Sequence, residues 1–399
     1  MEGDLIYINK KLRPLSWLYG LGVGFRNMLF DMGILKSRAY KVPVISVGNI
    51  TVGGTGKTPH VEYLISLMKD KMKVAVLSRG YKRKSKGFVL AGKDTTMKEI
   101  GDEPFQMMQK FPDITVAVDK KRTRGIDKLT SGEYVDDIDV VLLDDAFQHR
   151  YVKPGINILL VDYHRLIIYD ELLPSGRLRE PVKSKDRADI VIVTKCPQDL
   201  KPMEFRVITK AMRLYPYQQL FFSTHEYGEL FPLGSLGNLG NLENLGNQVS
   251  LESLANQHIL LLTGIASPKQ MLHDLQGYTE HIQPLTFPDH HNFSRKDIQR
   301  INEVFDSMPS PRLIITTEKD ATRLATVEGL SDDVRQHLYV LPIHIRLLQD
   351  QEEAFNEKIL GYVRKNSRNS IPAKGKADRK TQGSSHTEEK PRIISFRNN

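Results

Sequence analysis

One run of residues constrains the fold more than any other feature: Thr51-Val-Gly-Gly-Thr-Gly-Lys57-Thr58, which lies between an apolar segment and a segment of helical character. Its glycines let backbone N–H groups approach phosphate oxygens, and the dipole of the following helix favours the same negative charge. The Lys57 ammonium can reach the outer phosphates of a nucleotide, and the Thr58 hydroxyl can ligate Mg²⁺. The run predicts a P-loop, although Thr51 stands where the strict pattern has glycine. The nucleotide-binding residues expected here are Thr51, Val52, Gly53, Gly54, Thr55, Gly56, Lys57 and Thr58.

A second apolar run, Val140–Leu143, ends in two adjacent carboxylates, Asp144 and Asp145. At the carboxyl edge of a parallel sheet, side chains in this position face the phosphate site. We expect Thr58, Asp144 and Asp145 to hold the metal ion of the nucleotide. Because adjacent side chains on a strand point in opposite directions, one carboxylate would support the metal while the other orients a neighbour or a water.

Short β-branched runs alternate with helix-length polar segments along most of the chain. This alternation is typical of βαβ units with a buried, mostly parallel sheet. The predicted fold class is α/β, with a P-loop NTPase-like lobe and a second, smaller α/β lobe. Strands are expected at Val42–Val47, Val74–Ser78, Val116–Val118, Val140–Leu143, Ile156–Val161, Ile190–Thr194, Ile259–Leu262 and Leu313–Thr316.

Composition divides the chain into five parts. Residues 1–39 form an N-terminal helical region, and residues 40–215 the P-loop lobe. Residues 216–255 are expected to be a linker, because a Leu/Gly/Asn repeat within them is rich in turn formers. Residues 256–365 form the second lobe, and the polar, basic residues 366–399 predict a disordered tail.

The N-terminal region has apolar residues at near-helical spacing between Leu15 and Leu35, preceded by Lys10, Lys11 and Arg13. Charged residues interrupt the run, whereas a membrane span needs about 20 largely apolar residues. We expect an amphipathic helix, which either lies on a bilayer surface or packs on the protein's own core. No cleavable signal peptide is apparent.

The net charge of the chain excludes few classes of binding partner. The formal charge of +9 and the pI near 9.3 suit nucleic acid, an anionic membrane surface or a phosphorylated substrate, without choosing among them. The single cysteine, Cys196, excludes an intrachain disulfide and is typical of a reducing cytosol.

Three further turns carry groups suited to phosphoryl chemistry. Gly101–Pro104 supplies Asp102 and Glu103, although the residues alone favour a helix start with an N-cap and a Glu that complements the helix dipole. Phe287-Pro-Asp-His290 supplies an acid–base pair but lacks the spacing of a zinc site. Thr317-Glu-Lys-Asp320 resembles the guanine-reading motif of GTPases, yet it follows the P-loop by about 260 residues, so ATP is favoured over GTP.

Taken together, these strings resemble the tetraacyldisaccharide 4'-kinase family, the lipid A 4'-kinases of Gram-negative bacteria, over about residues 5–360. Ala146 and Lys82 depart from the family pattern, which has glycine at the first position and often at the second. The matching strings, in the family's order, are Ser46-Val-Gly-Asn-Ile-Thr-Val-Gly-Gly-Thr-Gly-Lys-Thr58, Leu77-Ser-Arg-Gly-Tyr81, Gly101-Asp-Glu-Pro104, Leu143-Asp-Asp-Ala-Phe-Gln-His149, Leu173-Pro-Ser-Gly-Arg-Leu-Arg-Glu-Pro181, Thr263-Gly-Ile-Ala-Ser-Pro268, Phe287-Pro-Asp-His290 and Thr317-Glu-Lys-Asp320.

The resemblance implies transfer of the γ-phosphate of ATP to the 4'-hydroxyl of a tetraacylated glucosamine disaccharide 1-phosphate, which forms the lipid A precursor lipid IVA and requires Mg²⁺. It implies two α/β lobes joined by a hinge. It also implies a monotopic protein on the cytoplasmic face of the inner membrane. This location favours the interpretation that the N-terminal helix lies on a bilayer surface. We expect a monomer with no nucleic acid partner.

The resemblance also assigns roles to individual residues. Asp102 would be the base that takes the hydroxyl proton, assisted by His290 from the second lobe, while Lys57 acts on the phosphates. The residues that would organise Mg²⁺ and the phosphates or line the phosphate-transfer site are Asp144, Asp145, His149, Arg122, Arg179 and Glu180.

Two other classes of protein remain as alternatives. A membrane-associated regulatory ATPase of the positioning type would have a second lysine early in the P-loop, where this chain has Val52 and Gly53. A nucleic-acid-binding P-loop protein would bind polyanions in a salt-sensitive manner even without the residues after Asn366. Neither class explains the Gly-Asp-Glu-Pro and Phe-Pro-Asp-His strings.

Overall fold

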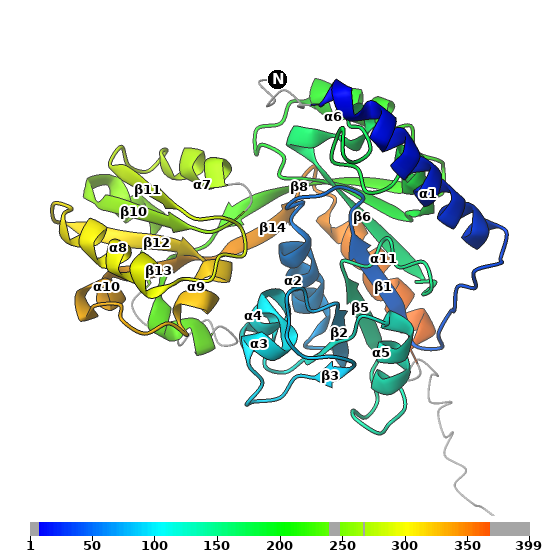
Figure 1. Ribbon diagram of the computed structural model, residues 1–399, viewed down its shortest axis with the longest axis horizontal. Coiled ribbons are helices and arrows are strands. Elements are labelled where there is room, and N and C mark those ends of the chain that lie inside the picture. Colours follow the sequence, from blue (N-terminus) through cyan, green and yellow to red (C-terminus); the bar gives the residue numbers. More distant parts are fainter. Residues whose placement is uncertain (1–7, 239–247, 266–267, 368–399) are drawn as a thin grey trace, which may run out of the picture.

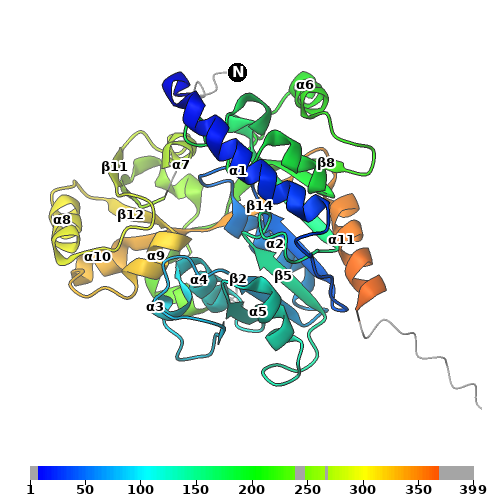
Figure 2. The same ribbon diagram turned by 45° about the vertical axis from the view of Figure 1, so that its right-hand side comes forward.

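The computed structural model describes residues 8–238, 248–265 and 268–367. The expected disordered tail and most of the Leu/Gly/Asn repeat lie outside these residues. The described chain forms two lobes, each built on its own sheet with flanking helices, and helix α1 (Arg13–Asp31) runs along the outside of the larger lobe (Figures 1 and 2). The predicted α/β class with a second, smaller lobe is confirmed.

The larger lobe contains a nine-stranded sheet in the order β14-β8-β7-β6-β1-β5-β2-β4-β3. The neighbours from β8 to β4 are parallel, and only the edge strands β14 and β3 run antiparallel to their partners. The strands of this sheet are β1 (Val44–Gly48), β2 (Val74–Ser78), β3 (Val89–Leu90), β4 (Thr115–Val118), β5 (Val140–Asp144), β6 (Ile156–Asp162), β7 (Ile190–Thr194), β8 (Gln219–Tyr227) and β14 (Ile343–Leu347).

Helices cover both faces of this sheet because its strands are apolar on both sides. Helices α2, α4 and α11 contribute to one core with Ile45 and Val47, whereas α5 and α6 contribute to cores on the opposite face. Fully burying an aliphatic side chain such as Ile45 stabilises a fold by roughly 1.5–3 kcal/mol. The helices are α2 (Lys57–Met68), α3 (Met97–Ile100), α4 (Asp102–Lys110), α5 (Arg122–Leu129), α6 (Pro202–Met212) and α11 (Glu352–Asn366).

The smaller lobe has a five-stranded sheet in the order β11-β10-β12-β13-β9, in which only β9 is antiparallel to its neighbour. Apolar side chains of α8, α9 and α10 pack against it in one core. Its elements are β9 (Phe231–Pro232), β10 (His258–Thr263), α7 (Pro268–Leu275), β11 (Ile282–Thr286), α8 (Arg295–Asp306), β12 (Arg312–Thr317), α9 (Glu318–Leu324), α10 (Asp332–His337) and β13 (Leu338–Leu341).

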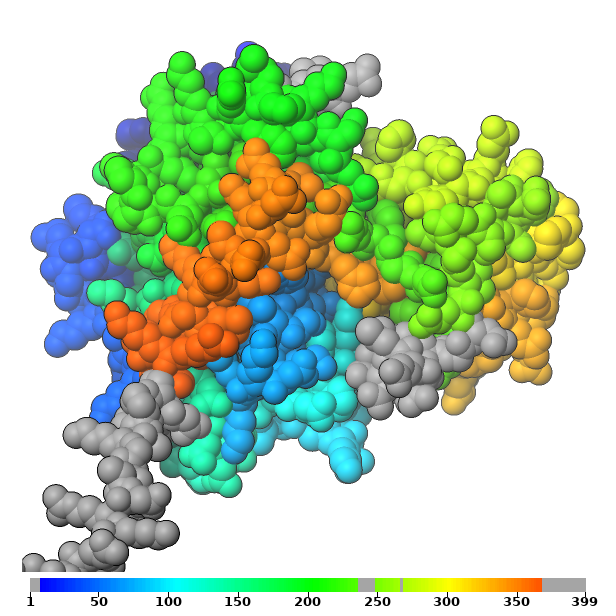
Figure 3. All heavy atoms as spheres, turned by 180° about the vertical axis from the view of Figure 1, so that it is seen from behind, coloured from blue at the N-terminus to red at the C-terminus, as the bar shows by residue number. Residues whose placement is uncertain are grey.

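Two antiparallel strands, β8 and β14, connect the lobes. The expected domain boundaries therefore need correction. Strand β8 lies in the segment expected to be a linker, and β14 and α11 return to the larger lobe although residues 256–365 were assigned to the second. Figure 3 shows the returning segment, in orange, packed across the larger lobe. Phe355, Ile359 and Val363 of α11 enter the same core as α2, which is the physical reason for the return.

All eight expected strands are present, with ends that differ from the prediction by at most two residues. The strands that the sequence did not indicate are β3, β8, β9, β11, β13 and β14. Most are short or alternate polar and apolar residues, so their pairing depends on neighbours that are distant in the chain.

Helix α1 lies on the larger lobe with few of its side chains buried. Ser16 and Phe30 are buried, whereas large apolar side chains on the rest of its surface, including Trp17 at 68% and Phe25 at 59%, are exposed. The Ser16 hydroxyl accepts a hydrogen bond from the backbone N–H of Ser175 at 2.9 Å. Within the described residues, no helix combines the length and the apolar character that are needed to cross a membrane.

Candidate active site

The phosphate loop occupies the junction of β1 and α2 at the centre of the large sheet. Gly53 and Gly56 have φ angles of 122° and 78°, which L side chains rarely adopt, so glycine is required at both positions. Asn49 donates to the Thr55 hydroxyl at 2.8 Å, and the Thr194 hydroxyl donates to the Thr55 carbonyl at 3.0 Å. The loop is therefore held in shape by the ends of β1 and β7.

Lys57 and the carboxylates after β5 meet beside this loop, as predicted. The Lys57 ammonium lies 3.7 Å from Asp145 Oδ1, and the Arg179 guanidinium lies 3.2 Å from the same oxygen. Although burial opposes it, these two cations hold the pKa of Asp145 below its usual value. Arg179 also donates to the Asn49 side chain, which ties this arginine to the start of the loop.

Asp144 is fully buried and differs from its neighbour. Ser78 donates to its Oδ2 at 2.9 Å, while Oδ1 has no hydrogen-bond partner among the described residues. Burial, together with Glu103 and Asp145, raises the pKa of Asp144 to about 7. An unpaired carboxylate oxygen with a raised pKa fits a position where a cation is needed.

These residues fit a magnesium ion bound mainly through phosphates and water. Among the described residues, no three His, Cys, Asp or Glu side chains are grouped to hold a metal. Mg²⁺ usually keeps several waters and takes only one or two carboxylates in addition to substrate phosphates. The hydroxyl of Thr58 and the carboxylates of Asp144 and Asp145 match that donor set.

A cleft of about 200 Å³ separates the phosphate loop from the second lobe. Gly54, Thr55, Gly56, Lys57 and Thr58 line its first wall, and the residues of the other lobe that face them include Gln270, Met271, Asp289, Glu318 and Lys319.

Asp102 and His290 meet beside this cleft although they belong to different lobes. His290 Nδ1 lies 2.7 Å from Asp102 Oδ2, and Arg323 of α9 donates to the same oxygen at 2.6 Å. Burial favours the neutral carboxyl, but the hydrogen bonds from His290 and Arg323 and the charge of Lys319 hold the pKa of Asp102 well below its usual value. Asp102 also begins α4, as the helix-start interpretation predicted, and it contacts His290, while its role as a base stays a prediction.

Further ion pairs join α4 to α9 along the same interface. The Lys110 ammonium lies 2.7 Å from Glu62 of α2 and 2.6 Å from Glu318 of the second lobe, and the side chains of all three are at most 12% exposed. The Lys319 ammonium lies 3.4 Å from Glu103 and 3.3 Å from Asp289. Three ion pairs therefore join α4 to α9, namely Asp102–Arg323, Glu103–Lys319 and Lys110–Glu318.

Two other predicted site residues do not face the cleft. Arg122 is 1% exposed, and its guanidinium donates to the backbone carbonyls of Asp119 and Asp144, each at 3.0 Å. Glu180 is buried and pairs with Arg187 at 2.5 Å. In this arrangement Arg122 supports the backbone beside the carboxylates. One oxygen of Glu180 receives Arg187, whereas the other has no hydrogen-bond partner among the described residues, so its place beside the phosphates stays a prediction.

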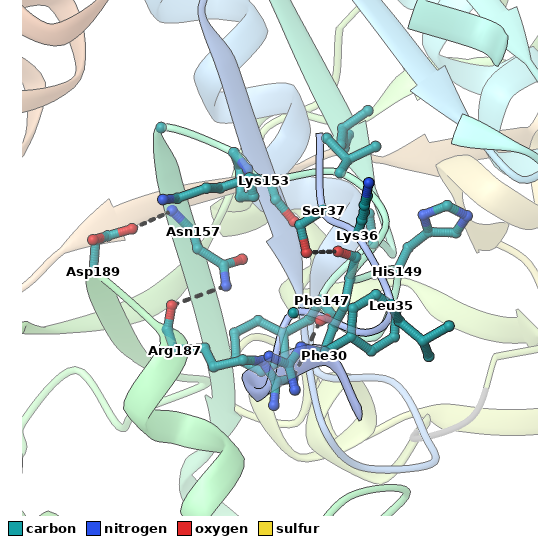
Figure 4. A pocket seen from close by; sticks show the side chains of 18 residues that line it. Phe30, Leu35, Lys36, Ser37, Phe147, His149, Lys153, Asn157, Arg187 and Asp189 are labelled. Carbon is teal, nitrogen blue, oxygen red and sulfur yellow. Dashed lines mark hydrogen bonds between the residues drawn. The ribbon is translucent and has the colours of Figure 1, made fainter. Parts of the chain in front are cut away.

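His149 lines a second, larger cavity of about 820 Å³, on the face of the sheet covered by the segment after α1. Burial lowers the pKa of His149 to about 4, so the ring is neutral at physiological pH. In Figure 4 its ring lies on the side of the cavity away from Asn157 and Asp189. The expected role of His149 beside the phosphates stays a prediction.

Arg323, Lys110 and Lys195 are site residues for which the sequence alone assigned no role. Lys195 donates to the carbonyl of Gly54 and lies 2.8 Å from Asp162, which closes the phosphate loop against β6 and β7. Its place directly after an apolar strand was the only available signal. No sequence signal pointed to Arg323 or Lys110, because their partners in the other lobe lie 221 and 208 residues away.

The fold and the site together define a class: a P-loop phosphotransferase with a second lobe that places an acid–base pair across from the phosphate loop. Comparison with known proteins agrees. Residues 8–364 match the family model described as tetraacyldisaccharide-1-P 4'-kinase. The chain therefore belongs to the tetraacyldisaccharide-1-P 4'-kinase family.

Individual relatives support this membership. A tetraacyldisaccharide 4'-kinase of Phocaeicola vulgatus is 59% identical over 372 residues, which covers 93% of this chain and 99% of the relative. One of Bacteroides thetaiotaomicron is 55% identical, with 93% and 97% covered. The crystal structure of LpxK from Aquifex aeolicus in complex with ATP superposes with a TM-score of 0.66 at 30% identity, and the match covers 89% of this chain and 99% of the other.

Proposed function

We propose that this chain transfers the γ-phosphate of ATP to the 4'-hydroxyl of a tetraacylated glucosamine disaccharide 1-phosphate, which forms lipid IVA in lipid A biosynthesis. The observation that carries the proposal is the 2.7 Å contact between Asp102 and His290 beside the cleft that the phosphate loop lines. A P-loop alone binds a nucleotide, whereas an acid–base pair beside it supplies what an alcohol acceptor requires.

On the donor side, residues of the phosphate loop hold ATP. The backbone N–H groups from Gly53 to Thr58 surround the β- and γ-phosphates, and the Lys57 ammonium leaves Asp145 to neutralise the charge that develops on the transferring group. Thr58, Asp144 and Asp145 would hold Mg²⁺, which would act as a Lewis acid and stabilise the negative charge of the phosphates. Arg179 keeps Asp145 turned toward this site.

On the acceptor side, Asp102 Oδ1 is the atom available to the hydroxyl. Oδ2 already receives His290 and Arg323, whereas Oδ1 receives only the backbone N–H of Glu103 at 3.1 Å. The low pKa of Asp102 makes it a weak base. A weak base is sufficient because phosphoryl transfer passes through a loose transition state, in which the attacking oxygen loses its proton late.

The lipid acceptor requires that the reaction take place at a membrane. We propose that the exposed apolar side chains of α1 insert into the cytoplasmic face of the inner membrane, while exposed Lys10 and Lys11 face anionic headgroups. The protein is then monotopic and acts as a monomer.

The decisive experiment incubates purified protein with γ-labelled ATP, Mg²⁺ and the acylated disaccharide 1-phosphate in detergent micelles. Label is expected on the lipid, with no transfer when the acceptor lacks its 4'-hydroxyl. Hydrolysis of ATP without labelled lipid would refute the kinase assignment and support the regulatory ATPase instead.

A further inference from the structure

His60 is a buried histidine of α2 that the proposed chemistry does not use. Its ring is 4% exposed and makes two contacts at once. Nδ1 lies 2.7 Å from the carbonyl oxygen of Gly56 in the phosphate loop, and Nε2 lies 3.0 Å from the Ser223 hydroxyl of β8.

The direction of both hydrogen bonds follows from the chemistry of the partners. A carbonyl oxygen only accepts, so Nδ1 carries the proton and donates to Gly56. Burial lowers the pKa of His60 to about 4, so the ring is neutral and Nε2 is an acceptor. The Ser223 hydroxyl therefore donates to Nε2, and a chain of two hydrogen bonds runs from Ser223 through His60 to Gly56.

At one end, this chain acts on the peptide that binds phosphate. The Gly56 carbonyl belongs to the same peptide group as the N–H of Lys57, which begins α2 and points toward the phosphate site. A hydrogen bond to the carbonyl polarises the peptide and makes its N–H a stronger donor. The same carbonyl accepts the backbone N–H of His60 at 3.3 Å, so the ring adds a second, shorter hydrogen bond at 2.7 Å.

At the other end, the chain reaches the root of the hinge. Strand β8 pairs with β7 as far as Phe222, and the Ser223 carbonyl accepts one more hydrogen bond from the backbone N–H of Cys196, just after β7. From Ser223 to Tyr227 it pairs with β14, and these two strands lead into the second lobe. Ser223 is thus the first residue of the two-stranded connection and is fully buried.

We propose that His60 is a positioning residue that couples the phosphate loop to the root of the hinge, so that nucleotide bound at Gly56 and Lys57 biases the arrangement of the two lobes. This inference rests on the proposed phosphotransfer and deepens it. The residue touches neither ATP nor the acceptor and acts through the peptide of Gly56 and the strand at Ser223.

Two substitutions of His60 separate the two contacts. In His60→Asn, the amide nitrogen stands near the place of Nδ1 and still donates to Gly56, but the link to Ser223 is lost. In His60→Gln, the amide stands near the place of Nε2 and still accepts from Ser223, but the link to Gly56 is lost. Ser223→Ala removes a single hydroxyl and should behave like His60→Asn. Ser66→Ala, on the exposed side of α2, is the matched control.

Steady-state lipid phosphorylation at varied ATP supplies the test. We expect His60→Gln to raise KM for ATP about fivefold with kcat within about twofold, since one hydrogen bond contributes a factor of about 2–13. His60→Asn and Ser223→Ala should lower kcat about fivefold and leave KM for ATP within about twofold. The Gly56 carbonyl keeps its hydrogen-bond donor, whereas the connection from α2 to the hinge at Ser223 is lost.

Other results overturn the coupling. Identical kinetic profiles for His60→Asn and His60→Gln, or wild-type kinetics for Ser223→Ala, exclude a relay through this ring. If a His60 variant does not fold in a thermal unfolding scan, Ser223→Ala alone decides. Absence of lipid phosphorylation in the wild-type protein refutes the proposed function, whereas an active wild-type protein with unaffected variants refutes only the coupling.

Discussion

The phosphate loop and the acid–base pair are two halves of one site, but they are built in opposite ways. The loop consists of eight consecutive residues, Thr51–Thr58, between β1 and α2. The pair of Asp102 and His290 joins residues 188 positions apart and exists only while the two lobes are in contact. The comparison teaches that ATP binding is locally encoded, whereas the transfer step depends on how the lobes meet.

The largest loss of activity is expected when the phosphate loop is altered. Lys57→Ala removes the ammonium that neutralises the phosphates, so kcat/KM should fall by about 10⁴-fold and ATP affinity should fall with it. Lipid phosphorylation and equilibrium dialysis with ATP measure both quantities. Lys93→Ala, an exposed lysine of the same lobe, is the control. Unchanged ATP affinity would mean that Lys57 acts only during the transfer.

A somewhat smaller loss of activity is expected when the acid–base pair is altered. Asp102→Ala removes the base and should lower kcat by about 10³-fold, while the dissociation constant for ATP stays within about twofold. The loss of kcat compared with the loss of ATP affinity distinguishes the acid–base pair from the phosphate loop. An equal loss of ATP affinity in Asp102→Ala and Lys57→Ala would contradict the role of Asp102 as a base.

The interlobe contact itself is tested by Lys110→Met. This change leaves the buried carboxylates of Glu62 and Glu318 without their shared cation, so the free energy of unfolding should fall by about 3 kcal/mol. The looser contact should lower kcat about 30-fold, within the range known for misplaced catalytic groups. The double variant Lys110→Met/Glu318→Gln should recover part of both losses. Additive losses in the double variant would show that the two side chains act independently.

The smallest effect is a shift in pH dependence. Asp102 acts as a base only when ionised, and its low pKa keeps it ionised as the pH falls below the usual value of about 3.9. Arg323→Gln removes one cationic donor, so the pKa of Asp102 should rise and the acidic limb of the kcat/KM profile should move to higher pH by about one unit. The activity lost is therefore at acidic pH, with less than about a tenfold change at pH 7. An acidic limb that does not move would exclude Arg323 as the cause of the low pKa.

Most of the large sheet could be predicted because each of its central strands is a continuous apolar run bounded by turns. β2 and β7 have the predicted ends, and the carboxylates after β5 lie beside Lys57 as expected. The hinge could not be predicted, because β8 is half polar, β14 alternates polar and apolar residues, and the two strands pair across more than a hundred residues of the second lobe. The roles of Arg323 and Lys110 could not be predicted for the same reason, because their partners in the other lobe lie 221 and 208 residues away in the chain.

The sequence by itself determined the α/β class, the P-loop and the two carboxylates at the end of β5, because these depend on residues that are neighbours in the chain or on strands that must be buried. It also carried the family resemblance, and through it the pairing of Asp102 with His290. The tertiary structure decided which charged groups face the cleft. The side chain of Arg122 is directed at two backbone carbonyls and that of Glu180 at Arg187, while Arg323 and Lys110 form ion pairs between the two lobes. Long side chains can point in several directions from the same backbone, and only packing against distant elements selects one of them.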